Sequence, residues 1–201
     1  MTAVIYHLRG VDADLVAAWQ KYFAGIPEVR PAVGDIFGEK IDAIVSPANC
    51  FGDLSGGIDR LYSKRFGPVL QQRLQAVLRD DYDGELPIGL AVLVETGDAE
   101  VPYLISAPTM RVPLNISQTV NPYLAFRAVL RLVQKTNRLR PGTIGAVACP
   151  GLGTGTGEVP PLVCAKQMHA AYEQVVGGRP WRPADLNEAL VEHYRLLRTD
   201  D

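Results

Sequence analysis

The feature that most constrains the fold is a regular alternation of short apolar runs with longer amphipathic segments. Six runs have the length and composition of buried strands: residues 3–8, 28–33, 42–47, 88–94, 103–107 and 143–149. The other segments carry apolar residues three and four positions apart, which predicts helices near residues 13–23, 58–66, 68–78, 122–133, 160–176 and 185–197. Because strands that are apolar on both faces belong to covered sheets, we predict an α/β fold with a mixed, mostly parallel sheet and helices on both faces.

Several predicted helices have recognisable first residues. Asp12 can cap the first helix, because its side chain can accept hydrogen bonds from free backbone amides. Asn121 is expected to cap a later helix, with Pro122 at the first helical position. In sheets of this kind ligands bind beyond the carboxyl ends of the strands, so the loops that follow strands are where a site is expected.

The chain is long enough for one substantial domain. Its 201 residues are 47% hydrophobic, which allows a proper core. Gly177 and Gly178, followed by Pro180, mark a boundary. We therefore predict a domain of residues 1–177 and a C-terminal helical extension of residues 178–201, and residues 1–27 are a second candidate for an addition.

Charge and cysteine content exclude several classes of protein. The net charge of −2 provides no basic surface, so direct binding of nucleic acid is not expected. The odd cysteine count, three, argues against a disulfide framework and fits a reducing cytoplasm. No signal peptide and no long apolar run is evident, so neither secretion nor a membrane span is expected. The histidines and cysteines show no spacing that suggests a metal site.

A glycine-rich loop follows the last predicted strand. In the sequence from Cys149 to Pro161, "CPGLGTGTGEVPP", glycine takes every second place from Gly151 to Gly157. It matches neither the Walker A loop nor GxGxxG, but glycines between a strand and a helix let several amides point at an anion. We interpret the loop as an anion-binding cradle, and the alternative is a flexible turn.

Two earlier strand ends also carry polar residues. Asn49 follows the strand at residues 42–47, and Ser55, Gly56 and Gly57 precede a predicted helix that holds Asp59 in its first turn. Each residue has a structural alternative to a functional role. Asn49 can form a local turn through its own side chain, Asp59 can stabilise the positive end of the helix dipole, and Asp35 can be a turn carboxylate after Gly34.

Taken in order, these motifs resemble the macrodomain family, whose members bind ADP-ribose. The resemblance covers residues 28–176 and joins Gly34-Asp35-Ile36, Asp42–Asn49 with its "SPAN" ending, Gly56-Gly57-Ile58-Asp59 and Gly153–Gly157. The "SPAN" ending replaces the commoner "NAAN" and indicates an outlying branch, which we associate with bacteria or phages.

The resemblance implies a three-layer α/β/α macrodomain fold and a role for each motif. Asp35 would accept the adenine amino group, and the Ile36 amide would meet a ring nitrogen. Asn49 would hydrogen-bond the distal ribose. The first phosphate loop would comprise Gly56, Gly57 and Ile58, and the second Gly153, Thr154, Gly155, Thr156 and Gly157. The expected partner is ADP-ribose or an ADP-ribosylated macromolecule.

Many members of the family hydrolyse ADP-ribosyl bonds, and in one branch an aspartate at the position of Asp59 helps to position water. The resemblance therefore implies Asn49 and Asp59 as catalytic residues, with neither metal nor other cofactor. That branch has a histidine where this chain has Ser63, and another has a lysine one place from Lys64. The second phosphate loop is one residue short and lacks an aromatic residue, whose surface Phe51 could supply. A reader without turnover and a structural protein with a degenerate site are the alternatives.

Several further residues carry weaker expectations. Cys50 is a candidate nucleophile, but no histidine is placed by sequence to activate it. Cys149 and Cys164 are expected in the core, and His169 is expected to be packed. Tyr103 and the Ala107-Pro108 strand end are assigned either to the adenine side of the cleft or to the core.

Overall fold

A computed structural model describes residues 3–199 of the chain. Twelve elements follow one another in these residues: β1 (Ile5–Gly10), α1 (Ala13–Tyr22), β2 (Val29–Val33), β3 (Ala43–Ser46), α2 (Asp59–Phe66), α3 (Pro68–Tyr82), β4 (Val92–Glu95), β5 (Tyr103–Ser106), α4 (Asn121–Leu139), β6 (Ala146–Cys149), α5 (Pro161–Val175) and α6 (Leu186–Leu197). The predicted alternation of strands and helices is confirmed.

The strands form one six-stranded sheet in the order β2-β1-β6-β3-β5-β4. All neighbouring pairs from β2 to β5 are parallel, and only the edge strand β4 runs antiparallel, along β5. The predicted mixed, mostly parallel sheet is therefore confirmed. One consequence matters for function: β1, β2, β3, β5 and β6 all end at the same edge of the sheet.

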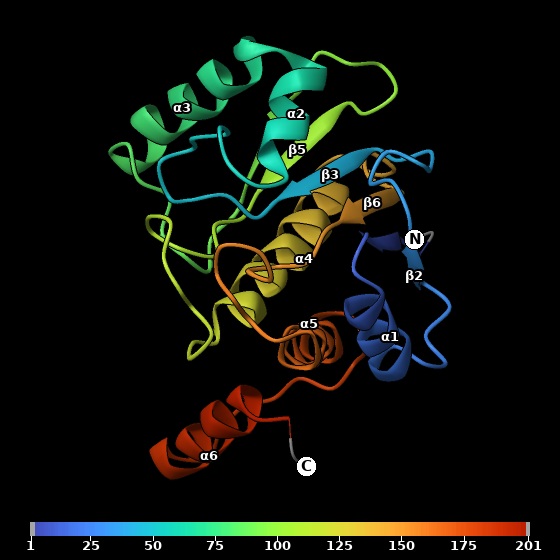
Figure 1. Ribbon diagram of the computed structural model, residues 1–201, viewed down its shortest axis with the longest axis vertical. Helices are drawn as coiled ribbons and strands as arrows, with labels where there is room; N and C mark the ends of the chain where they lie inside the picture. Colours follow the sequence, from blue (N-terminus) through green and yellow to red (C-terminus); the bar gives the residue numbers. More distant parts are fainter. Residues whose placement is uncertain (1–2, 200–201) are drawn as a thin grey trace.

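Helices cover both faces of the sheet and make two separate cores. Figure 1 shows α2 and α3 on one side of the sheet and α1, α4 and α5 on the other. On β3, Ala43 and Val45 face the larger core, which contains the apolar faces of α1, α4 and α5. Ile44 faces the smaller core beneath α2 and α3. This alternation is the two-residue period of a strand, and both of its faces are apolar because both are covered.

Helix starts agree with the predicted signals except at α4. Asp12 caps α1, since its carboxylate accepts hydrogen bonds from the amides of Asp14 and Leu15. The prediction that Asn121 caps α4 is wrong: Asn121 is already inside the helix, and its side chain donates to the Thr109 carbonyl at 2.7 Å. The Asn121 side chain therefore joins the helix to the loop after β5.

The bounds of three strands differ most from the prediction: β4, β1 and β6, the last of which begins at Ala146 instead of Thr143. The apolar run at residues 88–94 is only partly a strand, since β4 spans Val92–Glu95 and a turn around Gly89 occupies the earlier part. β1 begins and ends two residues later than predicted and lies inside the sheet, between β2 and β6. The N-terminal segment thus supplies an interior strand of the sheet.

α6 lies outside the layers, beyond α5, as Figure 1 shows. Leu196 is its one buried residue in the described part of the chain, and the Gln167 side chain of α5 donates to the Leu196 carbonyl at 3.1 Å. Residues 178–199 of the predicted extension are described, and residues 200–201, like residues 1–2, are not. The division at residue 177 stays a prediction.

Replacing Ile44 tests the smaller core. Ile44 is fully buried at the centre of the sheet, so Ile44→Ala leaves a cavity and should lower the free energy of unfolding by about 2–5 kcal/mol. Urea unfolding measures this change, with an unchanged slope showing that the folded state is intact. Val33→Ala is the control, because Val33 is 60% exposed on the edge strand, and it should change stability by less than about 0.5 kcal/mol. Equal effects of the two substitutions would contradict the described core.

Candidate functional site

The carboxyl ends of the five parallel strands border one cleft of about 1070 Å³. Residues 9–11 after β1, 34–37 after β2, 47–49 after β3, 109–110 after β5 and 150–151 after β6 all line it. The structure brings every residue predicted for the site to this one cleft: Asp35, Ile36, Asn49, Gly56, Gly57, Ile58, Asp59, Gly153, Thr154, Gly155, Thr156 and Gly157. Their role in binding stays a prediction.

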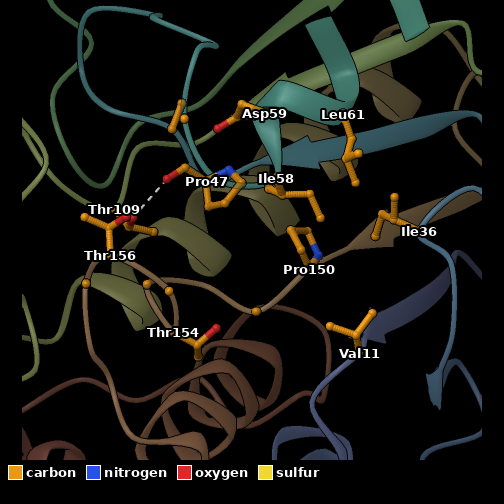
Figure 2. A pocket seen from close by; sticks show the side chains of 18 of the residues that line it. Val11, Ile36, Pro47, Ile58, Asp59, Leu61, Thr109, Pro150, Thr154 and Thr156 are labelled. Atoms are coloured by element: carbon orange, nitrogen blue, oxygen red, sulfur yellow. Dashed lines mark hydrogen bonds between the residues drawn. The ribbon is translucent and has the colours of Figure 1, made fainter. Parts of the chain in front are cut away.

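Two loops face each other across the cleft with unused amides. Figure 2 shows Ile58 and Asp59 on one side and Thr154 and Thr156 on the other. The backbone amides of residues 56–58 and of residues 153–157 donate no hydrogen bond to any other described residue. Backbone N–H groups are obligatory donors, so two facing sets of free donors make a strong anion-binding arrangement. α5 adds little, because its cap and first residue, Pro160 and Pro161, have no N–H.

The glycines of the second loop divide into two kinds. A side-chain carbon at Gly157 would lie 2.5 Å from the Gly153 carbonyl oxygen, and one at Gly153 would lie 2.7 Å from Ile116. These glycines are therefore required by packing inside the loop, and Gly153 also has a φ of +73°. A side-chain carbon at Gly155 would meet nothing within 4 Å. Glycine at that position keeps the cleft open.

Asp59 is a buried carboxylate in the wall of the cleft. It begins α2 and is only 5% exposed. Burial raises its pKa from 3.8 to about 7; the nearby Ser46 hydroxyl opposes this effect, and the negative charge of Asp53 adds to it. Near neutral pH this residue can hold or release a proton, which an exposed aspartate cannot do.

Buried polar atoms without partners gather around Asp59. Among residues 3–199 these atoms are Asp59 Oδ1, Ser46 Oγ and Ser106 Oγ. Ser46 and Ser106 are register partners at the ends of β3 and β5, so they lie side by side below the start of α2. Buried polar groups are almost always hydrogen-bonded in proteins, and exceptions concentrate at functional sites. This group of unpartnered polar atoms distinguishes the Asp59 end of the cleft from the other end.

The loop between β3 and α2 is fixed by side chains. Asn49 Oδ1 accepts from the Phe51 amide at 3.0 Å and the Asp53 amide at 3.4 Å, and Asn49 Nδ2 donates to the Asp53 carbonyl at 3.0 Å. The turn role of Asn49 is thus present, and one of its N–H groups stays available for a ligand. The Ser63 hydroxyl donates to the Leu54 carbonyl at 2.8 Å, so Ser63 holds this loop.

The opposite end of the cleft is built on an ion pair. Arg9 of β1 is buried and donates to Glu39 at 2.7 Å and to the Arg30 carbonyl at 2.6 Å. Its guanidinium also lies 3.1 Å from His7 Nδ1, and burial together with the Arg9 charge lowers the pKa of His7. These bonds fasten β1 to the loop that carries Asp35, whose Oδ1 accepts from the Phe37 amide at 3.0 Å.

Sequence reasoning missed some residues of the site. Arg9, Val11, Asp53, Leu61 and Met110 line the cleft without having been selected. Val11 is 90% exposed, and Figure 2 shows it together with Ile36 among the side chains that line the cleft. Arg9 directly follows the apolar run at residues 3–8, and a charged residue at the end of a buried strand could have been recognised as a candidate for the site. The others lie in loops whose direction only the folded chain defines.

The remaining expectations are now placed. Cys149 and Cys164 are fully buried in the core, and His169 packs edge-on against Phe23. Cys50 is buried too; burial raises the pKa of its thiol, and the thiol donates to the Met110 carbonyl, which opposes a nucleophilic role.

Phe51, Tyr103, Ala107 and Pro108, which were considered for the borders of the cleft, do not line it. Phe51 is not among the lining residues, and Arg111 lies over its ring. Thr109 and Met110 line the cleft after β5 where Tyr103 and Ala107 do not. Within the described residues, no group of histidine, cysteine and carboxylate side chains could hold a metal ion. No helix there is long and apolar enough for a membrane span.

Comparisons with known proteins identify relatives of the chain in sequence and in fold. The family profile described as "Macro domain" matches residues 45–168. An uncharacterized protein of Aquifex aeolicus is 33% identical over 178 residues, which are 85% of this chain and 97% of the relative. A DNA ADP-ribosyl glycohydrolase of Mycobacterium tuberculosis is 25% identical over 71% of this chain and 38% of its own length. The solved structure of a mutant Oceanobacillus iheyensis macrodomain with ADPR has a TM-score of 0.59 at 23% identity, covering 71% of this chain and 74% of that chain.

The buried carboxyl of Asp59 should make stability depend on pH. Its pKa is higher in the folded state than in the unfolded chain, so the folded state binds the extra proton between pH 4 and 7. Stability should therefore fall as pH rises through this range, by several kcal/mol at most. Asp59→Asn should remove this dependence and be more stable than the wild type at pH 8. Urea unfolding at pH 5 and pH 8 checks it, and an unchanged pH dependence in Asp59→Asn would refute the assignment.

Proposed function

The chain belongs to the macrodomain family, and we propose that its cleft binds ADP-ribose or a close derivative of it. The observation that carries the proposal is the pair of facing loops, at residues 56–58 and 153–157, whose amides have no partner in the described chain. Two loops of free N–H groups suit a diphosphate, whose two phosphates carry several acceptor oxygens each. Because members of the family bind ADP-ribose, we place a nucleoside on one side of the diphosphate and the second ribose on the other.

The rest of the ligand follows from the two ends of the cleft. Adenine would lie at the Arg9–Glu39 end, where the Asp35 carboxylate can accept from its amino group and the Ile36 amide has no other described partner. The distal ribose would lie at the opposite end, near Asn49 and Asp59. The solved Oceanobacillus iheyensis macrodomain with ADPR, which shares this fold, supports the choice of ligand.

A second function, hydrolysis of ADP-ribosyl linkages, is favoured by Asp59. A buried carboxyl with an unpartnered Oδ1 and a pKa of about 7 is suited to moving a proton. There Asp59 would exchange a proton at the linkage to the distal ribose C1″, and Asn49 would hydrogen-bond that ribose. The DNA ADP-ribosyl glycohydrolase among the relatives supports this activity. A reader module that binds ADP-ribose without turnover is the alternative.

The partner proposed on this basis is ADP-ribose, free or attached to a macromolecule. The three cysteines are free and buried, which fits the cytoplasmic location that the sequence predicts. A structural protein with a degenerate site is disfavoured, because the cleft is open at Gly56, Gly57 and Gly155. That alternative becomes the favoured one if the folded protein has no affinity for the nucleotide.

Calorimetric titration with ADP-ribose tests binding. We expect micromolar affinity, about −8 kcal/mol, with AMP binding more weakly. Gly155→Val should abolish binding without loss of stability, because its side chain projects into the open cleft. Asp35→Ala should weaken binding through loss of the adenine contact. Val33→Ala, on the exposed edge strand, is the control. No heat of binding from folded wild-type protein would reject the proposal.

Release of ADP-ribose from an ester, an O-glycoside and an N-glycoside of ADP-ribose tests hydrolysis. Asp59→Asn should lower the turnover number by about 100-fold or more and leave the affinity for ADP-ribose within threefold, because the amide has the same shape but carries no transferable acidic proton. Chromatography of the products measures the rate. If the wild type releases ADP-ribose from none of the three, it is a reader.

A further inference from the structure

We propose that Asp53 is a second catalytic carboxylate, which works with Asp59 at the distal ribose as a general base beside a general acid. This inference rests on the proposed hydrolysis of ADP-ribosyl linkages. Asp53 lies in the loop between β3 and α2 and lines the same cleft as Asp59. The family motifs that identify this chain do not include it.

The loop that carries Asp53 is held on both sides of the residue. The Asn49 side chain bonds both the amide and the carbonyl of Asp53. On the other side, Leu54 donates its amide to Gln71 Oε1 at 2.9 Å, and its carbonyl accepts from Ser63. Four hydrogen bonds from three side chains thus fix the backbone at residues 53 and 54. A preorganised backbone is what a catalytic group needs, because small displacements are costly in rate.

The Asp53 carboxylate itself is only partly engaged. Oδ1 accepts from the Ser55 amide at 2.9 Å, whereas Oδ2 makes no hydrogen bond to another described residue. The side chain is exposed at the cleft, in contrast to Asp59. One oxygen is therefore oriented by the protein, and the other can accept a proton or a hydrogen bond from a molecule in the cleft.

The surroundings of Asp59 are a second, independent observation that points to a ligand at this end of the cleft. It is only 5% exposed although it lines the cleft, and its Oδ1 has no partner in the described chain. The negative charge of Asp53 is close enough to favour a proton on Asp59. Two carboxyl groups whose surroundings separate their proton affinities are the usual basis for dividing the roles of acid and base.

The chemical step follows from this division and balances. Asp53 takes a proton from a water molecule, whose oxygen forms a bond to C1″ of the distal ribose. The bond from C1″ to the carrier atom breaks, and its electron pair goes to the carrier atom, which takes the proton of Asp59. Free ADP-ribose and the protonated carrier leave, Asp59 regains a proton from solvent, and Asp53 loses one. The negative charge of Asp53 also stabilises the positive charge that develops on the sugar.

Other ionisable groups lie on the same helix as Asp59. Burial raises the pKa of the Tyr62 hydroxyl, which donates to the Val45 carbonyl at 3.0 Å. Lys64 and Arg65 line the cleft from the later turns of α2, and Arg65 is paired with Asp98 and Glu100. Among the described acidic residues, Asp53 is the one whose charge raises the pKa of Asp59.

The test compares Asp53→Asn with the wild type in binding and in turnover at several pH values. Asparagine keeps the acceptor for the Ser55 amide and removes the charge. We expect ADP-ribose affinity within threefold of wild type and turnover lower by about 100-fold. The wild-type rate should fall at alkaline pH as Asp59 loses its proton. In Asp53→Asn this fall should begin at lower pH, because Asp59 loses a neighbouring negative charge.

Two further variants separate chemistry from structure. Asp53→Ala should regain part of its turnover when sodium formate supplies a carboxylate, which no purely structural role would allow. Asp80→Asn, an exposed carboxylate on α3, should match the wild type throughout.

The outcomes separate this inference from the proposed function. Wild-type turnover and an unchanged pH profile in Asp53→Asn would overturn the role of Asp53 alone. Binding without turnover in the wild type would overturn both the hydrolase and this inference, and binding would stand. Absence of ADP-ribose binding in the wild type would overturn the proposed function itself, and this inference with it.

Discussion

Parallel hydrogen bonding between β2, β1, β6, β3 and β5 is the constraint on which the site depends. Parallel strands need a crossover between them, and each crossover here leaves from the same edge of the sheet. Five loops therefore converge at that edge, and each contributes to the cleft. The chain returns along helices after β1, β3 and β5 and along residues 34–42 after β2. The cleft is a consequence of the topology, and the loop sequences decide what it can hold.

The two ends of that cleft differ in how their buried charged residues are stabilised. At one end Arg9 is buried but compensated, since Glu39 and backbone carbonyls satisfy its guanidinium. At the other end Asp59 is buried and uncompensated, and the protein tolerates the unfavourable desolvation of its charge. A compensated ion pair fixes a loop, whereas an uncompensated carboxyl holds a proton that can react. The loss of stability at the Asp59 end is the sort that active sites commonly carry.

The loop at residues 153–157 shows how glycine serves two purposes in one segment. Gly153 and Gly157 allow the second loop to turn against Ile116, and Gly155 leaves the space in front of the amides open. Sequence alone makes these glycines equivalent, since they alternate with similar neighbours. Only the folded loop distinguishes the residues needed to form it from the residue that leaves room for a ligand.

The layers, the class of the sheet and the motifs that meet at the cleft could be predicted from the sequence. Apolar runs and helical spacing are local patterns, and the motifs after the strands occupy short stretches that can be recognised without the fold. Other features appear only in the folded chain. β1 lies inside the sheet, the Asn121 side chain bonds the Thr109 carbonyl, Asn49 and Ser63 support one loop, and Asp53 lines the same cleft as Asp59. These features depend on contacts between residues far apart in the chain and on burial, which sets the proton affinity of Asp59. Neither long-range contact nor desolvation is written in a local pattern, so both appear only when the chain is folded.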